Sequence, residues 1–338
     1  MGLEKTAKNS KLKSMLETIF MDWKALLILI GLVIVLSIAS DVFFTPVNLI
    51  NVLRQICAST TLGVGFTLVV ASGSIDLSVG CMVGMVGTFS ALLATRAAGI
   101  PGIVVILITL GVGLACGLLN GSLISVLKLP FFIATIATMS IFQGVNYLAC
   151  NNSSVTGIPD WFKKIGQGYV GVVPIPVIIM VIMVIAGVIL VKKTTFGRNA
   201  LALGGNKEAA RVCGVNVRKV EIGVFVFMGL CAAITALILT GRAASAQTSA
   251  GQGMEMDAIA AVVIGGTPLS GGKGRMAGTL IGCLIVGCIN NGLNLLNVDS
   301  NWQLIAKGIL IIAAVMIDVW SAKFSDRMLK KKAEKVEK

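Results

Sequence analysis

Carboxamide side chains recur along one apolar segment in the C-terminal third of the sequence. Asn290, Asn294 and Asn297 are spaced at i, i+4 and i+7, so a helix would carry them on one face, with Asn291 beside it. Carboxamides both donate and accept hydrogen bonds, as contact with a small polar solute requires. A face of this kind avoids lipid and points into protein or a water-filled cavity. Two interpretations stay open: contact with a passing solute, or hydrogen bonds that join helices.

A second apolar segment carries polar groups at two depths. Gln143 and Asn146 lie toward one end of the 131–150 segment, and Thr135 and Thr138 lie deeper. These side chains have the same two interpretations as the asparagines. We therefore group all of them as candidate substrate-path residues: Asp76, Thr135, Thr138, Gln143, Asn146, Asn290, Asn291 and Asn294.

Asp76 is the one acid of the phrase GSIDLSVG, between two apolar segments. A carboxylate inside a membrane can relay protons or cations. An oxygen acceptor just before a helix instead satisfies free backbone N–H groups. Helix capping, a role in the solute path and ion coupling all stay open for Asp76, and Asp257 is similarly placed to cap the eighth segment.

Several kinds of chemistry are excluded by the residues present. The sequence has no histidine, which removes histidine acid–base catalysis and a Ser–His–Asp triad. Its eight cysteines never form a CxxC pair, so we expect small hydrophobes and no metal site. The phrase GGKGR at 271–275 has Gly274 where a phosphate-binding loop needs Ser or Thr. We expect no catalytic residues, no cofactor in this chain and no ATP hydrolysis by it.

The composition is that of a membrane protein. Of 338 residues, 56% are apolar and 13% are charged, and the mean hydropathy is +0.94. A membrane-spanning helix needs roughly 20 apolar residues. Ten apolar segments meet this description approximately, and they predict an all-α polytopic fold: 25–44, 50–72, 77–95, 103–126, 131–150, 172–191, 221–241, 256–270, 276–297 and 302–320.

The basic residues predict the orientation of these ten spans. Residues 1–24, the 192–220 loop and the residues after Trp320 hold five, seven and seven of the 28 Lys and Arg residues. Lys and Arg gather on the cytoplasmic side, so both termini are predicted to be cytoplasmic. This orientation also accounts for the formal charge of +13, so we expect no nucleic-acid partner.

Short repeated features suggest internal symmetry and tight helix packing. Asn120-Gly121 and Asn291-Gly292 are 171 residues apart, as are the starts of the second and seventh segments near 50 and 221. With ten spans the related helices would run in opposite directions, as in an inverted repeat. Glycines four residues apart, such as Gly80 and Gly84, predict close contact between helix backbones.

The 192–220 loop is the longest predicted cytoplasmic connection. Residues 199–203 can form a helical turn that Gly204-Gly205 breaks, and Asn206 can cap a second helix that Gly214 ends. Two short helices on the membrane face suit docking to another protein. The alternative is a solvated basic loop.

Several phrases, in matching order over about 20–320, resemble the permeases of ribose-type ATP-binding-cassette importers. EAARVCG fits the core of the loop by which such permeases engage their ATPases, within the longer phrase GRNALALGGNKEAARVCGVNV. GSIDLSVG, LPFFIATIATMSIFQGV and the stretch 246–298 match the family as well. Ser74 stands where the family often has a second Gly, and an I-x-L-P ending of the importer motif is missing.

The resemblance implies a ten-helix inverted-repeat permease fold like that of vitamin B12 importers. It implies a cytoplasmic segment 1–24, one permease domain over 25–320 and a basic cytoplasmic tail over 321–338. The 192–220 loop would contact the ATPase through residues matching the family's docking loop: Gly197, Arg198, Asn199, Gly204, Gly205, Asn206, Glu208, Ala209 and Arg211.

The resemblance also implies the partners and the location. The chain would sit in the bacterial cytoplasmic membrane with a second permease copy (identical or a sister chain), an ATPase that binds ATP and Mg, and an external sugar-binding protein. The expected cargo is a simple sugar such as ribose. Two alternatives remain: an ATP-driven importer of nucleosides or another small polar solute, and a proton-coupled secondary transporter using Asp76.

Overall fold

The computed structural model describes residues 25–96, 99–299, 301–309, 311–313 and 315–316. The segments 1–24 and 321–338, to which the sequence assigns cytoplasmic positions, lie outside these described residues. Every predicted apolar segment contains a helix. Their bounds are a first helix Ala25–Ala39, then α2 Pro46–Ala71, α3 Val79–Arg96, α4 Gly102–Ser125, α5 Phe131–Ala149, α7 Ile175–Lys193, α10 Val217–Ala243, α11 Met254–Ile264, α12 Met276–Leu295 and a C-terminal helix Asn301–Ala313.

Seven of the described helices are long and apolar enough to cross a membrane: α2, α3, α4, α5, α7, α10 and α12. The eighth predicted segment, 256–270, differs most from expectation. Its helix α11 has 11 residues and ends at Ile264, ahead of a turn in which Gly266 has φ of 85°. At 1.5 Å per residue it is about 16 Å long, roughly half of a bilayer core.

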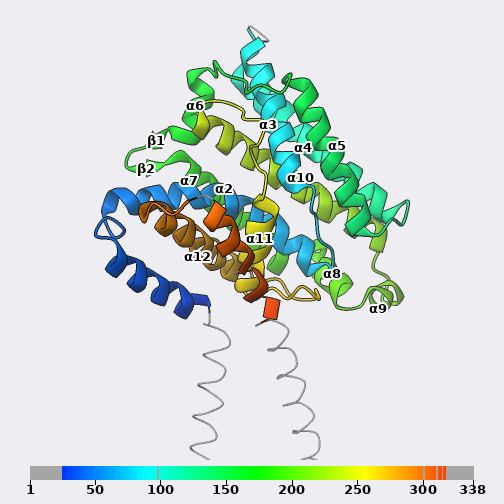
Figure 1. The fold of residues 1–338 in the computed structure, drawn as a ribbon. Coiled ribbons are helices and arrows are strands. Elements are labelled where there is room, and N and C mark those ends of the chain that lie inside the picture. The colour runs from blue at the N-terminus through cyan, green and yellow to red at the C-terminus, as the bar shows by residue number, and fades with distance from the viewer. Residues whose placement is uncertain (1–24, 97–98, 300, 310, 314, 317–338) are drawn as a thin grey trace, which may run out of the picture.

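The remaining elements lie between the long helices. The helix α6 (Asp160–Gln167) precedes an antiparallel pair, β1 (Tyr169–Val170) and β2 (Val173–Pro174). The helices α8 (Thr195–Gly205) and α9 (Lys207–Val212) form the connection between α7 and α10. Figure 1 shows α8 and α9 at one edge of the molecule and α6, β1 and β2 at the opposite edge. We call these edges the α8–α9 end and the α6 end.

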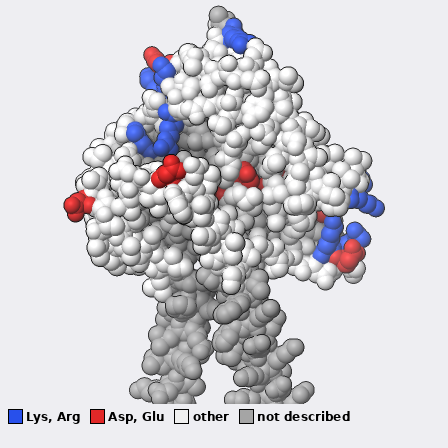
Figure 2. All heavy atoms as spheres, viewed as in Figure 1, with Lys and Arg blue, Asp and Glu red and all other residues white. Residues whose placement is uncertain are grey.

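Glycines allow the central helices to approach closely, as their spacing predicts. A Cβ atom at Gly113 of α4 would lie 2.5 Å from the carbonyl oxygen of Gly229 in α10. Gly282 of α12 packs in the same way on the Ala261 carbonyl of α11. The core around these crossings is apolar, with Phe66 and Phe225 fully buried. Charged side chains occupy little of the face seen in Figure 2, and several gather at the α8–α9 end.

Candidate functional site

Polar side chains cap both short helices of the 192–220 loop. Thr194 Oγ1 accepts a hydrogen bond from Gly197 N at 3.0 Å, and Asn206 Oδ1 accepts one from Ala209 N at 2.9 Å. The predicted cap at Asn206 is confirmed. The predicted break is displaced, because α8 starts at Thr195 and includes Gly204 and Gly205, and the chain leaves the helix at Asn206. Gly214, with φ of 84°, follows the end of α9.

Three segments that are distant in the sequence meet at the α8–α9 end. Gly204 of α8 lies against the carbonyl of Ala71, the last residue of α2. Gly272 donates a hydrogen bond to the same carbonyl at 2.9 Å. Gly73 and Gly271 touch Gly204 and have φ near 80°. We call this contact the glycine junction: Gly73, Gly204, Gly271 and Gly272.

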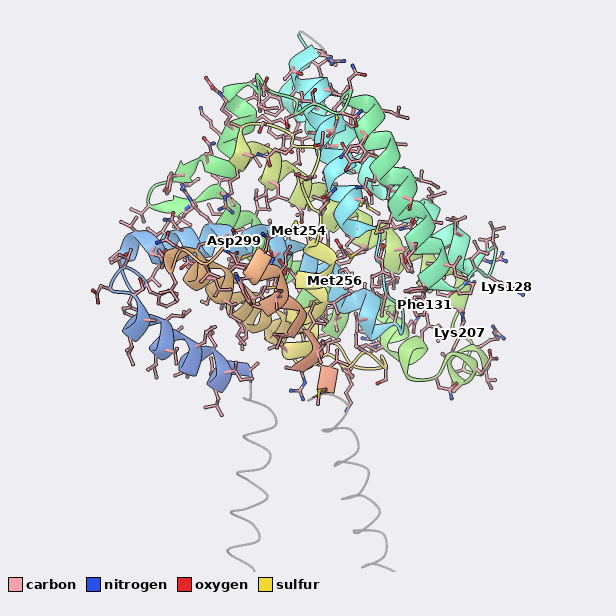
Figure 3. All side chains as sticks on the ribbon, in the orientation of Figure 1. Lys128, Phe131, Lys207, Met254, Met256 and Asp299 are labelled. Atoms are coloured by element: carbon pink, nitrogen blue, oxygen red, sulfur yellow. The ribbon has the colours of Figure 1, made fainter. Side chains whose placement is uncertain are left out.

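A groove of about 930 Å³ opens beside the glycine junction. Its walls are α8 and α9, the start of α10, and the turn between α4 and α5 that includes Lys128 and Phe131. Figure 3 shows Lys128, Phe131 and Lys207 together at this end. Such a groove is large enough to admit the side chains of a docked protein segment.

The charges around the groove are partly paired. Lys207 contacts Glu221 at 2.5 Å, and Arg211 contacts Glu208 at 3.0 Å within α9. Lys128 makes no ion pair among the described residues. Glu208 and Arg211 therefore present a paired acid and base to a partner protein, and not two isolated charges.

The structure divides the predicted coupling residues into two groups. Gly197 is buried against Val191 of α7, and Gly204 lies in the glycine junction, so these two position the loop. Asn199 is half-buried. The others are exposed on the surface of the loop: Arg198, Gly205, Asn206, Glu208, Ala209 and Arg211.

Asp76 is completely buried, in the extended segment between α2 and α3. Its Oδ1 accepts hydrogen bonds from Ser78 N at 2.9 Å and Ser78 Oγ at 2.6 Å. Asn120 Nδ2 of α4 donates to Ser78 Oγ at 2.8 Å and lies 3.4 Å from Asp76 Oδ2. In this conformation the carboxylate holds the turn before α3 and ties it to α4.

The candidates on α5 point mainly into protein. The buried hydroxyls of Thr135 and Thr138 donate to carbonyls of α5 itself, at 2.8 and 3.1 Å. Asn146 accepts a hydrogen bond from Thr88 at 2.6 Å and donates one to the Thr248 carbonyl at 3.0 Å. Gln143 is half-buried, and its Nε2 donates to the hydroxyl of Tyr147 at 2.9 Å.

Two of the three asparagines of α12 have partners on other helices. Asn291 exchanges two hydrogen bonds of 2.9 Å with Asn48 of α2, and Asn294 accepts one of 2.8 Å from Gln303 of the C-terminal helix. Asn290 Oδ1 is buried without a partner among the described residues. Asn290 lines a small cavity with Asp257.

The prediction that Asp257 caps the eighth helix is wrong. The N-cap of α11 is Gly253, with no side-chain cap, because the helix begins three residues before Asp257. Asp257 Oδ2 instead accepts a hydrogen bond from Lys307 Nζ at 3.0 Å. The pair joins α11 to the C-terminal helix, a contact that sequence spacing alone did not indicate.

Residues 48–315 match a family described as branched-chain amino acid transport system / permease component. The chain is 43% identical over 290 residues to the ribose import permease protein RbsC of Bacillus subtilis, covering 85% of this chain and 89% of the relative. It is 42% identical to the RbsC of Escherichia coli K12 over 88% and 94% of the two chains. It is 34% identical to the xylose transport permease XylH of Haemophilus influenzae, over 85% and 93%. No solved structure matches it.

Proposed function

Because the chain belongs to the permease-component family of branched-chain amino acid transport systems, we propose that it is the membrane-spanning subunit of an ATP-driven importer of ribose or a similar sugar. The assignment of ribose as the cargo rests on the sequence identity of 38 to 43% to ribose import permeases, which extends along most of both chains. The xylose transport permease is less similar, at 34%. The chain is a multi-pass membrane protein of a transport family, and no catalytic step is required of it.

The α8–α9 end is the surface that we assign to the ATPase. It presents two capped helices whose exposed residues are small or charged, beside a groove that can take side chains of a partner. ATP and its Mg would be held by that partner. Since the glycine junction fixes α8 to the ends of α2 and of the 265–275 turn, movement of α8 is transmitted to both.

The helix bounds support the inverted-repeat permease fold. An offset of 171 residues relates the start of α2 at Pro46 to the start of α10 at Val217. The same offset brings the starts of α3, α4 and α5 to within four residues of the starts of α11, α12 and the C-terminal helix, respectively. Helices related in this way in a ten-span chain are antiparallel, with both termini on the cytoplasmic side.

The α6 end is the surface that we assign to the external sugar-binding protein. Arg54 stacks over the ring of Tyr169 at 4.5 Å and donates a hydrogen bond to the Gln167 carbonyl. Gln167 in turn donates to the carbonyl of Arg242. Neither arginine has an ion-pair partner in the described part of the chain, so both can meet carboxylates of a partner.

Purification of the tagged chain from the cells that produce it tests the proposal. We expect an ATPase to co-purify with the wild type and to be lost from Glu208→Arg, which places a like charge beside Arg211. The matched control is Asp160→Arg, since Asp160 is also an exposed acid paired with a basic residue three positions on, at the opposite end.

Uptake assays separate the alternatives. ATP-dependent uptake of ribose that a nucleoside does not inhibit supports the sugar assignment. If the folded wild type reproducibly brings down no ATPase and takes up solute only with a proton gradient, the importer proposal is refuted. Asp76 would then be the first residue to substitute.

A further inference from the structure

The short helix α11 places its first residues in the middle of the membrane. After its last residue, Ile264, the chain reaches the α8–α9 end, where Gly272 bonds to the Ala71 carbonyl. Before its first residue, Met254, the chain comes from the α6 end, where Ala246 pairs with Val155. A helix of about 16 Å therefore ends at one side of the bilayer and begins about halfway through it.

The start of α3 lies beside the start of α11. Gly80, in the first turn of α3, packs on the carbonyl of Gly251 and on the carboxylate of Glu255. The strap formed by residues 246–253 crosses α3 at Gly84, where a Cβ atom would lie 2.6 Å from the Ala250 carbonyl. Gly80 and Gly84 were predicted to allow close backbone contact, and the segment that they contact is this strap.

Polar side chains from three elements lie between the start of α11 and the α6 end. Gln143 and Gln252 both donate to the hydroxyl of Tyr147, at 2.9 and 3.3 Å. Glu255 is half-buried and makes no ion pair among the described residues. Figure 3 shows the neighbouring Met254 and Met256 near the centre of the molecule, away from the α8–α9 end. We call Gln143, Tyr147, Gln252 and Glu255 the midplane cluster.

The partial exposure of this cluster requires a polar environment. Gln252 is exposed, and the other three side chains are half-buried. A carboxylate and two amides cannot face hydrocarbon inside the bilayer without a large cost. The asparagines of α12 differ, because Asn291 and Asn294 already have protein partners and the unpartnered Asn290 Oδ1 is buried. Within the described residues, the carboxylate of Glu255 in the midplane cluster is instead half-exposed and open to a solute.

We propose that the midplane cluster is a sugar-binding subsite in the half of the transport path nearer the α6 end, with Glu255 as the acceptor for sugar hydroxyls. A carboxylate accepts hydrogen bonds from two neighbouring hydroxyls, and the carboxamides and the phenol both donate and accept. The ring of Tyr147 offers an apolar surface to the C–H side of the sugar. This proposal rests on the proposed function, because it assumes that the cargo is a sugar.

Uptake kinetics test the subsite. With the ATPase and the binding protein present, we expect Glu255→Gln to lower the ratio of maximal uptake rate to half-saturating ribose concentration by about tenfold or more, the loss of a charged hydrogen bond. Tyr147→Phe should reduce it less. Asp41→Asn, at an exposed carboxylate in the turn before α2, makes the same carboxylate-to-amide change and should match the wild type. Each variant must co-purify with the ATPase as the wild type does.

Chemical labelling of Cys81 provides a second test of the subsite, and it needs no substitution. It is half-exposed in the first turn of α3, and the other cysteines are buried except Cys213, which lies in the α8–α9 loop. We expect a membrane-impermeant thiol reagent added from outside to label Cys81 during ATP-driven turnover, and saturating ribose to slow the labelling.

The outcomes distinguish the two proposals. Wild-type protein that takes up no ribose refutes the proposed function itself. Wild-type uptake with an unchanged Glu255→Gln variant refutes the subsite alone. Rapid cross-linking of Gln252→Cys between two chains, with Cys81 closed to the reagent, assigns the cluster to a contact with the second copy and also overturns the subsite.

Discussion

Adjacent glycines in α8 provide a matched test of the glycine junction. A Cβ atom at position 204 would overlap the Ala71 carbonyl and lie 2.7 Å from Gly272 N. At position 205 no atom lies within 4 Å of the added Cβ. Both substitutions to alanine change the same helix by the same methyl group, so they differ only in what that group meets.

The magnitude follows from the contacts that Gly204→Ala disrupts. The added methyl separates Gly272 from Ala71, whose hydrogen bond of 2.9 Å contributes about 1 kcal/mol. Forcing a methyl into a closely packed contact costs a further ~1–3 kcal/mol. We expect Gly204→Ala to lose about 2–4 kcal/mol of stability. Gly205→Ala should be neutral or slightly stabilising, because alanine favours helix more than glycine does.

A thiol-reactive fluorescent dye can follow unfolding in mild detergent, because six of the eight cysteines are buried. The midpoint temperature of Gly204→Ala should fall clearly below that of the wild type, and that of Gly205→Ala should not. Uptake of ribose by Gly204→Ala should fall as well. Equal midpoints for the two variants would refute the argument that residue 204 forms a tight three-segment contact.

Substitutions at three further sites test contacts inside the membrane. Asn48→Leu or Asn291→Leu alone leaves one buried amide unpaired and should lower the free energy of unfolding by ~1–3 kcal/mol. The double variant should recover much of the lost midpoint temperature. Purely additive effects in this double-mutant cycle would contradict the argument. Lys307→Met leaves Asp257 unpaired and should lower the yield of folded protein, which Asp257→Leu in the same chain should restore. Thr138→Val should leave uptake unchanged, since its hydroxyl bonds only to its own helix, and a loss of uptake would place it in the path.

The positions of the long helices could be predicted because the membrane imposes a simple rule on sequence. Each predicted segment contains a helix, and the caps at Thr194 and Asn206 depend on residues within three positions. The short length of α11 was missed, although Gly265, Gly266 and Pro268 follow Ile264 and are typical of a helix end. In the structure Gly266 has positive φ and lies against the Arg275 side chain.

The sequence identified the polar residues that make contacts, but it did not indicate which residues pair with each other. The spacing predicted Asn290, Asn294 and Asn297 on one helix face, but α12 ends at Leu295 and Asn294 is exposed. Asn291, which lies beside that face, meets Asn48, 243 residues away. No local pattern indicates such a partner, because it depends on how α2 and α12 cross. The same reason explains the wrong expectation for Asp257: a cap is a local feature, whereas its real partner Lys307 comes from another helix.

The helix α11 connects the two surfaces on which the proposals depend. Its first turn carries Glu255 beside the start of α3, and its last residue leads into the turn that holds Gly271 and Gly272 against Gly204. A helix of three turns is stiff over this length, and Gly282 of α12 packs tightly on its backbone at Ala261. Glycines with positive φ bound α11 at both ends, at Gly253 and Gly266, so the chain can bend there without bending the helix. Movement of α8 by an ATPase would therefore reach the midplane cluster as displacement of one rigid element, and the glycines at its ends are where the backbone would absorb the change.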